Sequence, residues 1–271
     1  AHNGVGWHST GTCGALGAAA AVARLWRFDA ARVADAITIA TSFAGGLWAF
    51  IHDGAQTKKI HAGRAAEGGL LAAQLAREGM RGPSLVFDDV WGGFFRAYDH
   101  RAGDVSRFTA DLGSPFKILR VSLKPYASCR GTHSAVDALD DVLRETGRDP
   151  RDIARIDVRA SALLVDMCGK PAIEPLAAAQ MSLPLALALR CAQGGTGLSA
   201  YAQARRHDPA VADVLGRIVV AIDAAMAPLD EPVLDILFRD GARFERMVPR
   251  ATGSPERPMT PAMIDAKFGE L

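Results

Sequence analysis

The sequence lacks an excess of charge of either sign, because 31 lysine and arginine residues stand against 30 aspartate and glutamate residues. Bulk electrostatics therefore gives no indication of a nucleic-acid partner, and any attraction for anions has to be local. Cysteine is scarce, and its four copies have neither a CxxC spacing nor a paired metal-ligand spacing: Cys13, Cys129, Cys168 and Cys191. This pattern suits a reducing compartment rather than a disulfide-built secreted fold.

Long apolar runs are also missing. The longest uncharged stretch, 1–23, is broken by histidines, hydroxyl residues and several glycines, so it does not predict a membrane span. It has no basic region of the kind that opens a secretory signal, and we expect a cytoplasmic protein. The chain begins without methionine and its first residues are typical of the middle of a fold, which predicts that an upstream segment is missing.

At 271 residues the chain can bury a sizeable core, as one large domain or two smaller ones. Alanine-rich, breaker-poor sequence predicts helices over 13–27 and from about 63 to 78, where small residues permit close packing. Asp29 is a candidate cap for a helix between them. The glycine-rich aromatic segment 90–98 predicts a loop or short helix. The first hundred residues are therefore expected to be all-helical.

The pattern changes near residues 113–115. Alternation over 119–123 and 153–158 predicts strands, 217–223 and 233–238 are expected to be extended, and Asp240-Gly241 predicts a tight hairpin. Helices are expected over 132–144, 183–190 and 199–206, and a last one begins at Thr260-Pro261. The fold class is therefore α+β: a helical domain over 1–115, a mixed unit over 116–253, and a returning helical segment over 254–271.

The stretch 56–66 concentrates local positive charge, because Lys58, Lys59 and His61 crowd the entry to a helix. A helix start carries unpaired N–H groups and a partial positive charge, so cations there are unfavourable unless an anion is bound. The alternative interpretation is an exposed basic turn.

Three further segments carry polar groups at helix starts. His8 precedes the first helix, where it either faces a cleft or is a structural histidine. The glycines of 11–17 are spaced GxxGxxG, without a preceding strand or a following P-loop lysine, which favours helix packing over a dinucleotide site. Segment 124–133 contains Lys124, Cys129 and Arg130, and segment 179–185 contains Ser182.

A metal site is not predicted, because no set of histidine, cysteine and aspartate residues has the usual ligand spacing. Cys129 and His133 are a possible nucleophile pair, but they lie four apart at the start of one helix. No oxyanion-hole signal accompanies them.

Taken in order, these segments resemble the MmgE/PrpD family, which includes 2-methylcitrate dehydratase, cis-aconitate decarboxylase and iminodisuccinate epimerase. The resemblance rests on GWHSTGT, TKKIHAGRAA, KPY with THSA, AQMSLP and the closing Pro261 and Lys267-Phe268, and it covers essentially the whole chain. It implies a helical domain, built from the N-terminal part plus the C-terminal helix, with a smaller inserted α+β lid. It also implies an active site in the cleft between them that uses neither metal nor organic cofactor.

The resemblance assigns catalytic roles to His8, Lys58 and Lys124, with Lys58 rather than Lys59 facing the site. Substrate-binding roles fall on His61, Cys129, Arg130 and Ser182. Two departures matter, because Cys129 replaces a catalytic histidine of the decarboxylase and Leu185 replaces a tyrosine. Both argue against an itaconate-forming decarboxylase. The family's N-terminal helical segment is a third departure, since it precedes the position where this chain begins.

Proton transfer next to a carboxylate needs cations that hold carboxylates and a base with a pKa near neutrality. The leading hypothesis is a lyase similar to 2-methylcitrate dehydratase. The alternatives are an epimerase or isomerase of a dicarboxylate, and a split-protein subunit that is inactive without a partner. We expect a homodimer or a partner chain that supplies the missing helices, with neither nucleic acid nor membrane as a partner.

Overall fold

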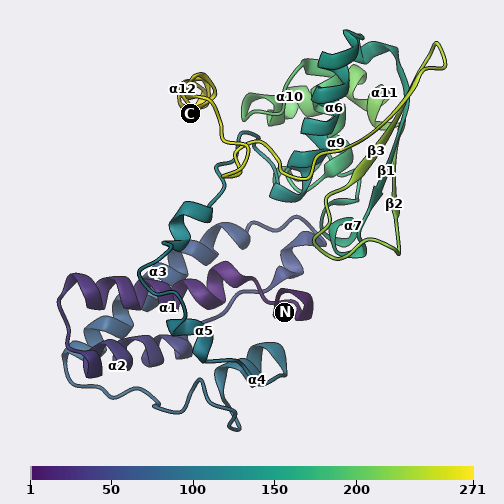
Figure 1. Ribbon diagram of the computed structural model, residues 1–271. Helices are drawn as coiled ribbons and strands as arrows, with labels where there is room; N and C mark the ends of the chain where they lie inside the picture. The colour runs from purple at the N-terminus through teal and green to yellow at the C-terminus, as the bar shows by residue number, and fades with distance from the viewer. Residues whose placement is uncertain (1) are drawn as a thin grey trace. The chain divides into compact units, whose positions relative to one another are not determined.

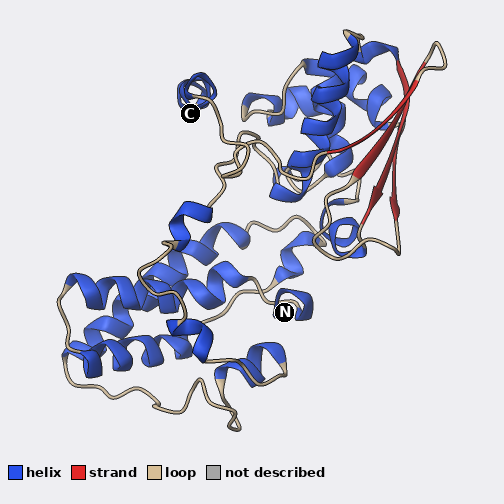
Figure 2. Cartoon of the chain, in the orientation of Figure 1, coloured by secondary structure: helices blue, strands red, loops and turns tan. Residues whose placement is uncertain are grey.

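The computed structural model describes residues 2–271, which form two compact units that divide between Ser114 and Pro115. The first is helical and the second combines helices with one sheet, so the predicted α+β class is confirmed (Figures 1 and 2).

Three helices form the core of the first unit: α1 (Ser9–Leu25), α2 (Ala30–Ala40) and α3 (Lys58–Arg77). Alanine dominates the buried contacts between them, namely Ala15, Ala19, Ala23, Ala36, Ala40, Ala65, Ala72, Ala73 and Ala76. A Cβ on Gly69 of α3 would lie 2.6 Å from the Ala15 carbonyl oxygen of α1. Helices α1 and α3 therefore cross in close contact, as the small residues predicted.

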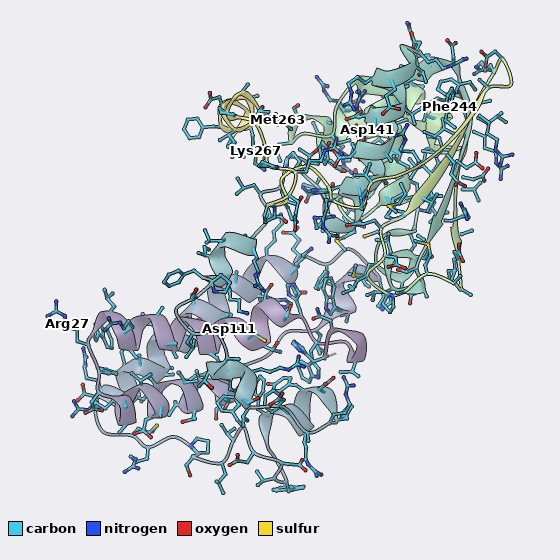
Figure 3. All side chains as sticks on the ribbon, viewed as in Figure 1. Arg27, Asp111, Asp141, Phe244, Met263 and Lys267 are labelled. Atoms are coloured by element: carbon cyan, nitrogen blue, oxygen red, sulfur yellow. The ribbon has the colours of Figure 1, made fainter. Side chains whose placement is uncertain are left out.

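Shorter elements complete this unit: η1 (His2–Val5), η2 (Thr41–Phe43), η3 (Trp48–Ile51), α4 (Phe94–Asp99) and α5 (Ser106–Thr109). The predicted cap is confirmed, since Asp29 accepts a hydrogen bond from the Arg32 backbone N–H. Arg27 lies in the turn before it (Figure 3). Helix α3 begins at Lys58, earlier than predicted, so Lys58 and His61 belong to its first turn.

The sheet of the second unit has the strand order β2-β1-β3-β4. Strand β1 (Ile153–Ala160) pairs in parallel with β2 (Ile218–Ile222) and antiparallel with β3 (Val233–Phe238). Strands β3 and β4 (Arg243–Met247) form the predicted hairpin, with Gly241 at a φ of +88° in its turn. That left-handed conformation favours glycine, which explains the Asp-Gly signal.

Helices cover one face of this sheet, with α6 (His133–Thr146) against β3 and β4, and α9 (Leu183–Gln193) against β2 (Figure 1). The buried strand residues alternate, as Leu234, Ile236 and Phe238 do on β3. The exposed side chains of β1 and β4 form ion pairs, among them Arg159 with Glu245 at 2.6 Å. One face is therefore apolar and packed, and the other is charged and solvated.

The remaining elements of this unit are η4 (Lys117–Arg120), η5 (Arg130–Thr132), η6 (Pro150–Asp152), α7 (Ala162–Cys168), α8 (Leu176–Ala179), η7 (Ser199–Tyr201), α10 (Gln203–Arg206), α11 (Pro209–Leu215) and α12 (Pro261–Glu270). On α6, Asp141 accepts hydrogen bonds from Arg144 and Arg257 (Figure 3). The helix expected over 199–206 is divided into η7 and α10.

The strand predicted over 119–123 is wrong. Residues 117–120 form a 3-10 turn, and Leu119, Val121 and Leu123 are all more than half exposed. Of this stretch, Leu123 alone pairs with another segment, donating its N–H to the Gly253 carbonyl at 2.8 Å. Alternation is not sufficient for a strand, because a strand also needs a ladder partner and a surface to cover.

The C-terminal helix α12 has the predicted cap, since the Thr260 hydroxyl accepts from the Met263 N–H. It is held within the second unit: Lys267 donates to the Lys124 carbonyl, and Ser199 donates to Glu270. That residues 254–271 complete the helical domain stays a prediction. Among residues 2–271, no helix is both long and apolar enough to cross a membrane.

Candidate functional site

Two histidines of the helical unit meet edge to edge. The Nδ1 atoms of His8 and His61 lie 2.7 Å apart, and both side chains are more than nine-tenths buried. His8 is the N-cap of α1 and donates its backbone N–H to the Gly46 carbonyl at 2.9 Å. His61 belongs to the first turn of α3. The structure thus brings together two predicted site residues that are 53 positions apart in the sequence.

Lys58 lies beside this pair on an aromatic wall. Its Nζ atom is 5.8 Å from the ring centre of Trp48 and 5.7 Å from that of Phe50. The His8 ring packs edge-on against Trp48, with 4.7 Å between ring centres. Lys58 is half-buried and Lys59 is exposed, so the two neighbouring lysines differ as predicted in their access to solvent.

Burial, followed by the electrostatic effects of His61 and Lys58, lowers the pKa of His8 to about 4. His8 is therefore neutral at physiological pH. A neutral imidazole has one nitrogen lone pair and can accept a proton. His8 can therefore accept a proton without first losing one to solvent, but its pKa is lower than the near-neutral value expected from the sequence for the base, because burial disfavours the imidazolium.

Two glycines shape the contact between α1 and the loop that precedes η3. A Cβ on Gly11 would lie 1.9 Å from the Gly45 carbonyl oxygen. Gly46 has a φ of +112°, and a Cβ there would lie 3.3 Å from three atoms of the His61 ring. The backbone of Gly45-Gly46 therefore lies close to α1 and to the His61 ring, and the positive φ of Gly46 favours glycine there.

A cavity of about 200 Å³ opens beside this contact. It is lined by His61, Arg64 and Ala65 of α3, together with Gly11, Phe43, Gly45, Gly46 and Ile60. Arg64 also forms an exposed ion pair with Glu67 at 2.8 Å. The cavity is small and carries basic groups of α3 on its wall, which suits a small anionic group.

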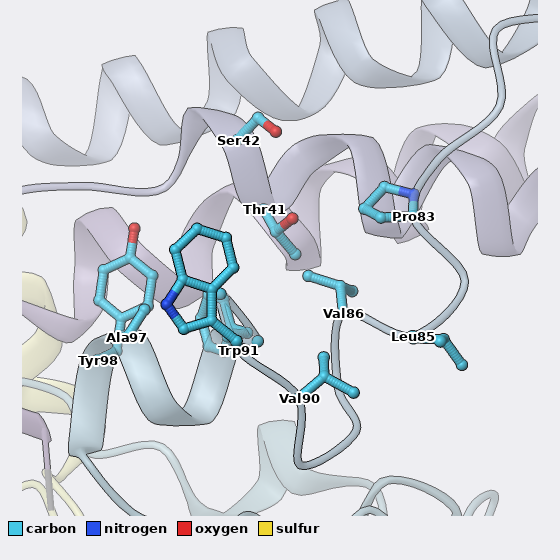
Figure 4. Close-up of a pocket in the computed structure, with 12 residues that line it drawn as sticks. Thr41, Ser42, Pro83, Leu85, Val86, Val90, Trp91, Ala97 and Tyr98 are labelled. Carbon is cyan, nitrogen blue, oxygen red and sulfur yellow. The ribbon is translucent and has the colours of Figure 1, made fainter.

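A larger cavity of about 410 Å³ lies between Thr41-Ser42 and residues 83–98 (Figure 4). Its wall is mostly apolar and includes the almost fully exposed Trp91. None of its lining residues is charged, and the Tyr98 hydroxyl donates to the Ala44 carbonyl. It therefore offers no cation for a carboxylate and contains none of the predicted site residues.

In the second unit the structure joins the segments 124–133 and 179–185. The Cys129 N–H donates to the Gln180 carbonyl at 2.8 Å, and the Gln180 side chain donates to the Ala127 carbonyl at 3.0 Å. Lys124 donates its ammonium to the Ser128 carbonyl at 3.2 Å. Lys124 and Cys129 are thus placed on one loop that is pinned at Gln180.

Two other predicted binding residues already have structural partners. Arg130 forms an ion pair with Glu231 at 3.0 Å, and Glu231 also accepts a hydrogen bond from the Ser134 hydroxyl. Ser182 is almost fully buried, and its hydroxyl accepts from the Leu185 N–H as the N-cap of α9. These contacts give Ser182 a capping role, and a role in binding substrate stays a prediction for both residues.

His133 is fully buried at the start of α6, with its Nε2 atom 3.4 Å from the Ser128 carbonyl oxygen. Burial lowers its pKa to about 3. A neutral imidazole supplies no positive charge that would stabilise a neighbouring thiolate, so the lowered pKa of His133 argues against a Cys129–His133 ion pair.

Sequence reasoning missed the aromatic wall. In the sequence, Trp48 and Phe50 lie between the Gly45-Gly46 pair and the basic stretch 56–66. Two aromatic residues at alternate positions, just before a group of lysines, were the signal that could have predicted this wall. It also missed Glu231, which lies 101 residues from Arg130 and has no distinguishing pattern around it. No group of three or more histidine, cysteine or acidic side chains within residues 2–271 could hold a metal ion.

Two models of one protein family match the chain. The MmgE/PrpD N-terminal domain matches residues 1–103, and the MmgE/PrpD C-terminal domain matches residues 126–271. His8, Lys58 and His61 fall within the first match, and Cys129, Arg130 and Ser182 fall within the second, whereas Lys124 lies two residues before the second match begins.

Several curated proteins are similar over different lengths. The cis-aconitate decarboxylase of Aspergillus terreus is 28% identical over 98% of this chain and 58% of its own length. That of Homo sapiens is 26% identical over 97% of this chain and 55% of its own length. The cis-aconitate decarboxylase-like protein oryM of Aspergillus oryzae is 33% identical over 51% of this chain and 30% of its own length. The chain thus spans less than two thirds of each relative.

Proposed function

The chain belongs to the MmgE/PrpD family, and from this premise we propose that the whole protein is a cofactor-independent lyase acting on a di- or tricarboxylate. The observation that carries the proposal is the contact of a buried, neutral His8 with His61 beside the half-buried Lys58. A base next to a partly desolvated cation suits removal of a proton adjacent to a carboxylate.

Each proposed role follows from the chemistry of the side chain. Lys58 and Lys124 hold substrate carboxylates and stabilise the negative charge that develops when the proton leaves. His8 accepts that proton. Arg130 and Cys129 contribute to substrate binding on the Lys124 loop, and the protein works as a homodimer or with a partner chain.

Dehydration of a hydroxy-polycarboxylate resembling 2-methylcitrate is the first reaction we propose. Two departures from the decarboxylase pattern support it. Position 129 is cysteine where the decarboxylase has a catalytic histidine, and position 185 is a fully buried leucine where the decarboxylase has a tyrosine hydroxyl. Decarboxylation of a substrate resembling cis-aconitate is the second candidate, because the matched relatives have that name. Assays of the natural full-length protein with both substrates, with product identified by mass, distinguish the two.

Epimerisation is a third outcome of the same assay, because a site that removes a proton can return it to the opposite face. Incorporation of solvent deuterium into recovered substrate, without net product, would replace the lyase proposal with an epimerase. A protein that is inactive until a second polypeptide is added would instead indicate a split-protein subunit.

The two neighbouring lysines provide a matched test of the site. We expect Lys58→Ala to reduce turnover of the full-length protein by two to four decades, about 3–5 kcal/mol of transition-state stabilisation. Lys59→Ala is the control, because an exposed charge contributes at most about a few tenths of a kcal/mol. Loss of activity in the Lys59 variant alone, or in neither variant, contradicts this assignment.

A further inference from the structure

The short contact between the two histidines constrains where their protons lie. With His8 Nδ1 and His61 Nδ1 only 2.7 Å apart, the contact is attractive when one nitrogen carries a proton and the other a lone pair. Two protons would clash, and two lone pairs would repel each other. The neutral rings must therefore be opposite tautomers, one protonated at Nδ1 and the other at Nε2.

We propose that His61 is a positioning residue that accepts the Nδ1 proton of His8 and thereby leaves the Nε2 lone pair of His8 as the proton acceptor. The hydrogen bond at one imidazole nitrogen selects the tautomer at the other. This inference rests on the proposed function, and it assigns His61 a role exerted through His8 in place of contact with the substrate.

The charge of Lys58 favours this direction. Lys58 is close enough for its charge to act on His8, and a cation stabilises a lone pair while it destabilises an N–H that points toward it. His8 Nδ1 already faces His61, so Nε2 is the ring atom that remains to present a lone pair.

The backbone around the pair holds both rings. The Gly46 carbonyl accepts a hydrogen bond from the His8 backbone N–H, and a Cβ added to Gly46 would lie 3.3 Å from the His61 ring. One loop thus limits the movement of both histidines. When His8 accepts a proton at Nε2, it becomes an imidazolium whose Nδ1–H still donates to His61. A fixed acceptor at Nδ1 stabilises such an imidazolium, as the carboxylate does in a serine-protease triad.

Nitrogen NMR of the chain labelled at histidine tests the tautomers without an activity assay. We expect His8 to be protonated at Nδ1 and His61 at Nε2 at pH 7. His61→Asn keeps an acceptor near the position of Nδ1, so His8 should keep its tautomer. His61→Phe keeps an aromatic ring against Gly46 without the acceptor, so His8 should change to the Nε2–H tautomer. The exposed His52, substituted as His52→Gln, is the control and should leave His8 unchanged.

A wild-type His8 protonated at Nε2 would overturn the inference, as would an unchanged His8 tautomer in a folded His61→Phe variant. Circular dichroism and tryptophan fluorescence establish that the variant is folded. In the full-length enzyme, His61→Phe should lower kcat by about 10²–10⁴-fold with little change in KM, and His61→Asn should recover much of the loss.

The two proposals fail in different ways. Suppose that the full-length protein has the two opposite tautomers but no activity on carboxylates. This result would overturn the proposed function and support the hydrogen bond from His8 to His61. An active lyase in which His8 and His61 have the same tautomer would support the function and overturn the role of His61.

Discussion

Adding one methyl group to Gly11 tests whether α1 and the Gly45-Gly46 loop meet as the structure shows. The new Cβ would lie 1.9 Å from the Gly45 carbonyl oxygen and 3.1 Å from its carbon, whereas real Cβ contacts essentially never fall below 3.0 Å. The obstacle is backbone, so it cannot be relieved by a change of side-chain rotamer. In Gly11→Ala the loop must move by about 1 Å or more, because overpacked contacts are relieved by backbone shifts.

The cost follows from this displacement. Overpacking typically destabilises a protein by about 1–3 kcal/mol, and the shift also strains the hydrogen bond from His8 to the Gly46 carbonyl. Gly17 is the matched control on the same helix, because a Cβ there meets nothing within 4 Å. Gly17→Ala should stabilise the helix by about 0.5–1 kcal/mol, because alanine is the better helix former.

Tryptophan fluorescence during urea unfolding is the appropriate measurement, because all four tryptophans lie in the helical unit: Trp7, Trp26, Trp48 and Trp91. We expect the midpoint to fall for Gly11→Ala and to rise for Gly17→Ala. Histidine NMR of Gly11→Ala should also show that the His8–His61 hydrogen bond is weakened. A Gly11→Ala variant with wild-type stability and an intact histidine pair would refute the close approach of Gly45 to α1. Equal destabilisation by both substitutions would show instead that α1 tolerates no added methyl group.

Three further predictions concern the second unit and the chemistry. Burial lowers the pKa of His133 to about 3, so its stabilising effect is complete above pH 6.5 and is lost as pH falls toward 3. The loss approaches about 4 kcal/mol, and urea midpoints at several pH values should depend less on pH in His133→Phe than in wild type. An equally steep dependence in the variant would contradict this cause. Ser182→Ala should cost about 1 kcal/mol of stability through loss of the α9 cap, with KM unchanged if Ser182 only caps the helix. A higher KM at unchanged stability would instead support substrate binding. Activity of the full-length protein should survive a strong chelator, and activity that is abolished and then restored by one divalent ion would overturn the metal-free proposal.

Much of the local structure was predictable from the sequence alone. Asp29 and Thr260 cap helices where the pattern of a small polar residue before a helix placed them, and Asp240-Gly241 turns the hairpin between β3 and β4. Capping and turn geometry involve only a few neighbouring residues, so a short window of sequence contains the cause. The alanine and glycine content of 13–27 and 63–78 likewise predicted close helix packing.

The strand expected over 119–123 shows where local pattern stops being sufficient. Its alternation is genuine, but a strand forms only when another segment supplies a hydrogen-bonding ladder, and that depends on distant parts of the chain. The start of α3 shows the same limit, because glycine at position 63 did not mark the boundary and the helix runs back to Lys58.

The candidate site also has some properties that the sequence predicts and others that depend on the tertiary structure. The motifs around His8, Lys58 and His61, followed in order by KPY, THSA and AQMSLP, were enough to indicate the family, and proton transfer beside carboxylates stays a proposal. Only the tertiary structure set the two Nδ1 atoms 2.7 Å apart, lowered the pKa of His8 through burial, and paired Arg130 with Glu231. Burial and hydrogen bonding are properties of groups brought together from distant positions, so no pattern along the chain specifies them.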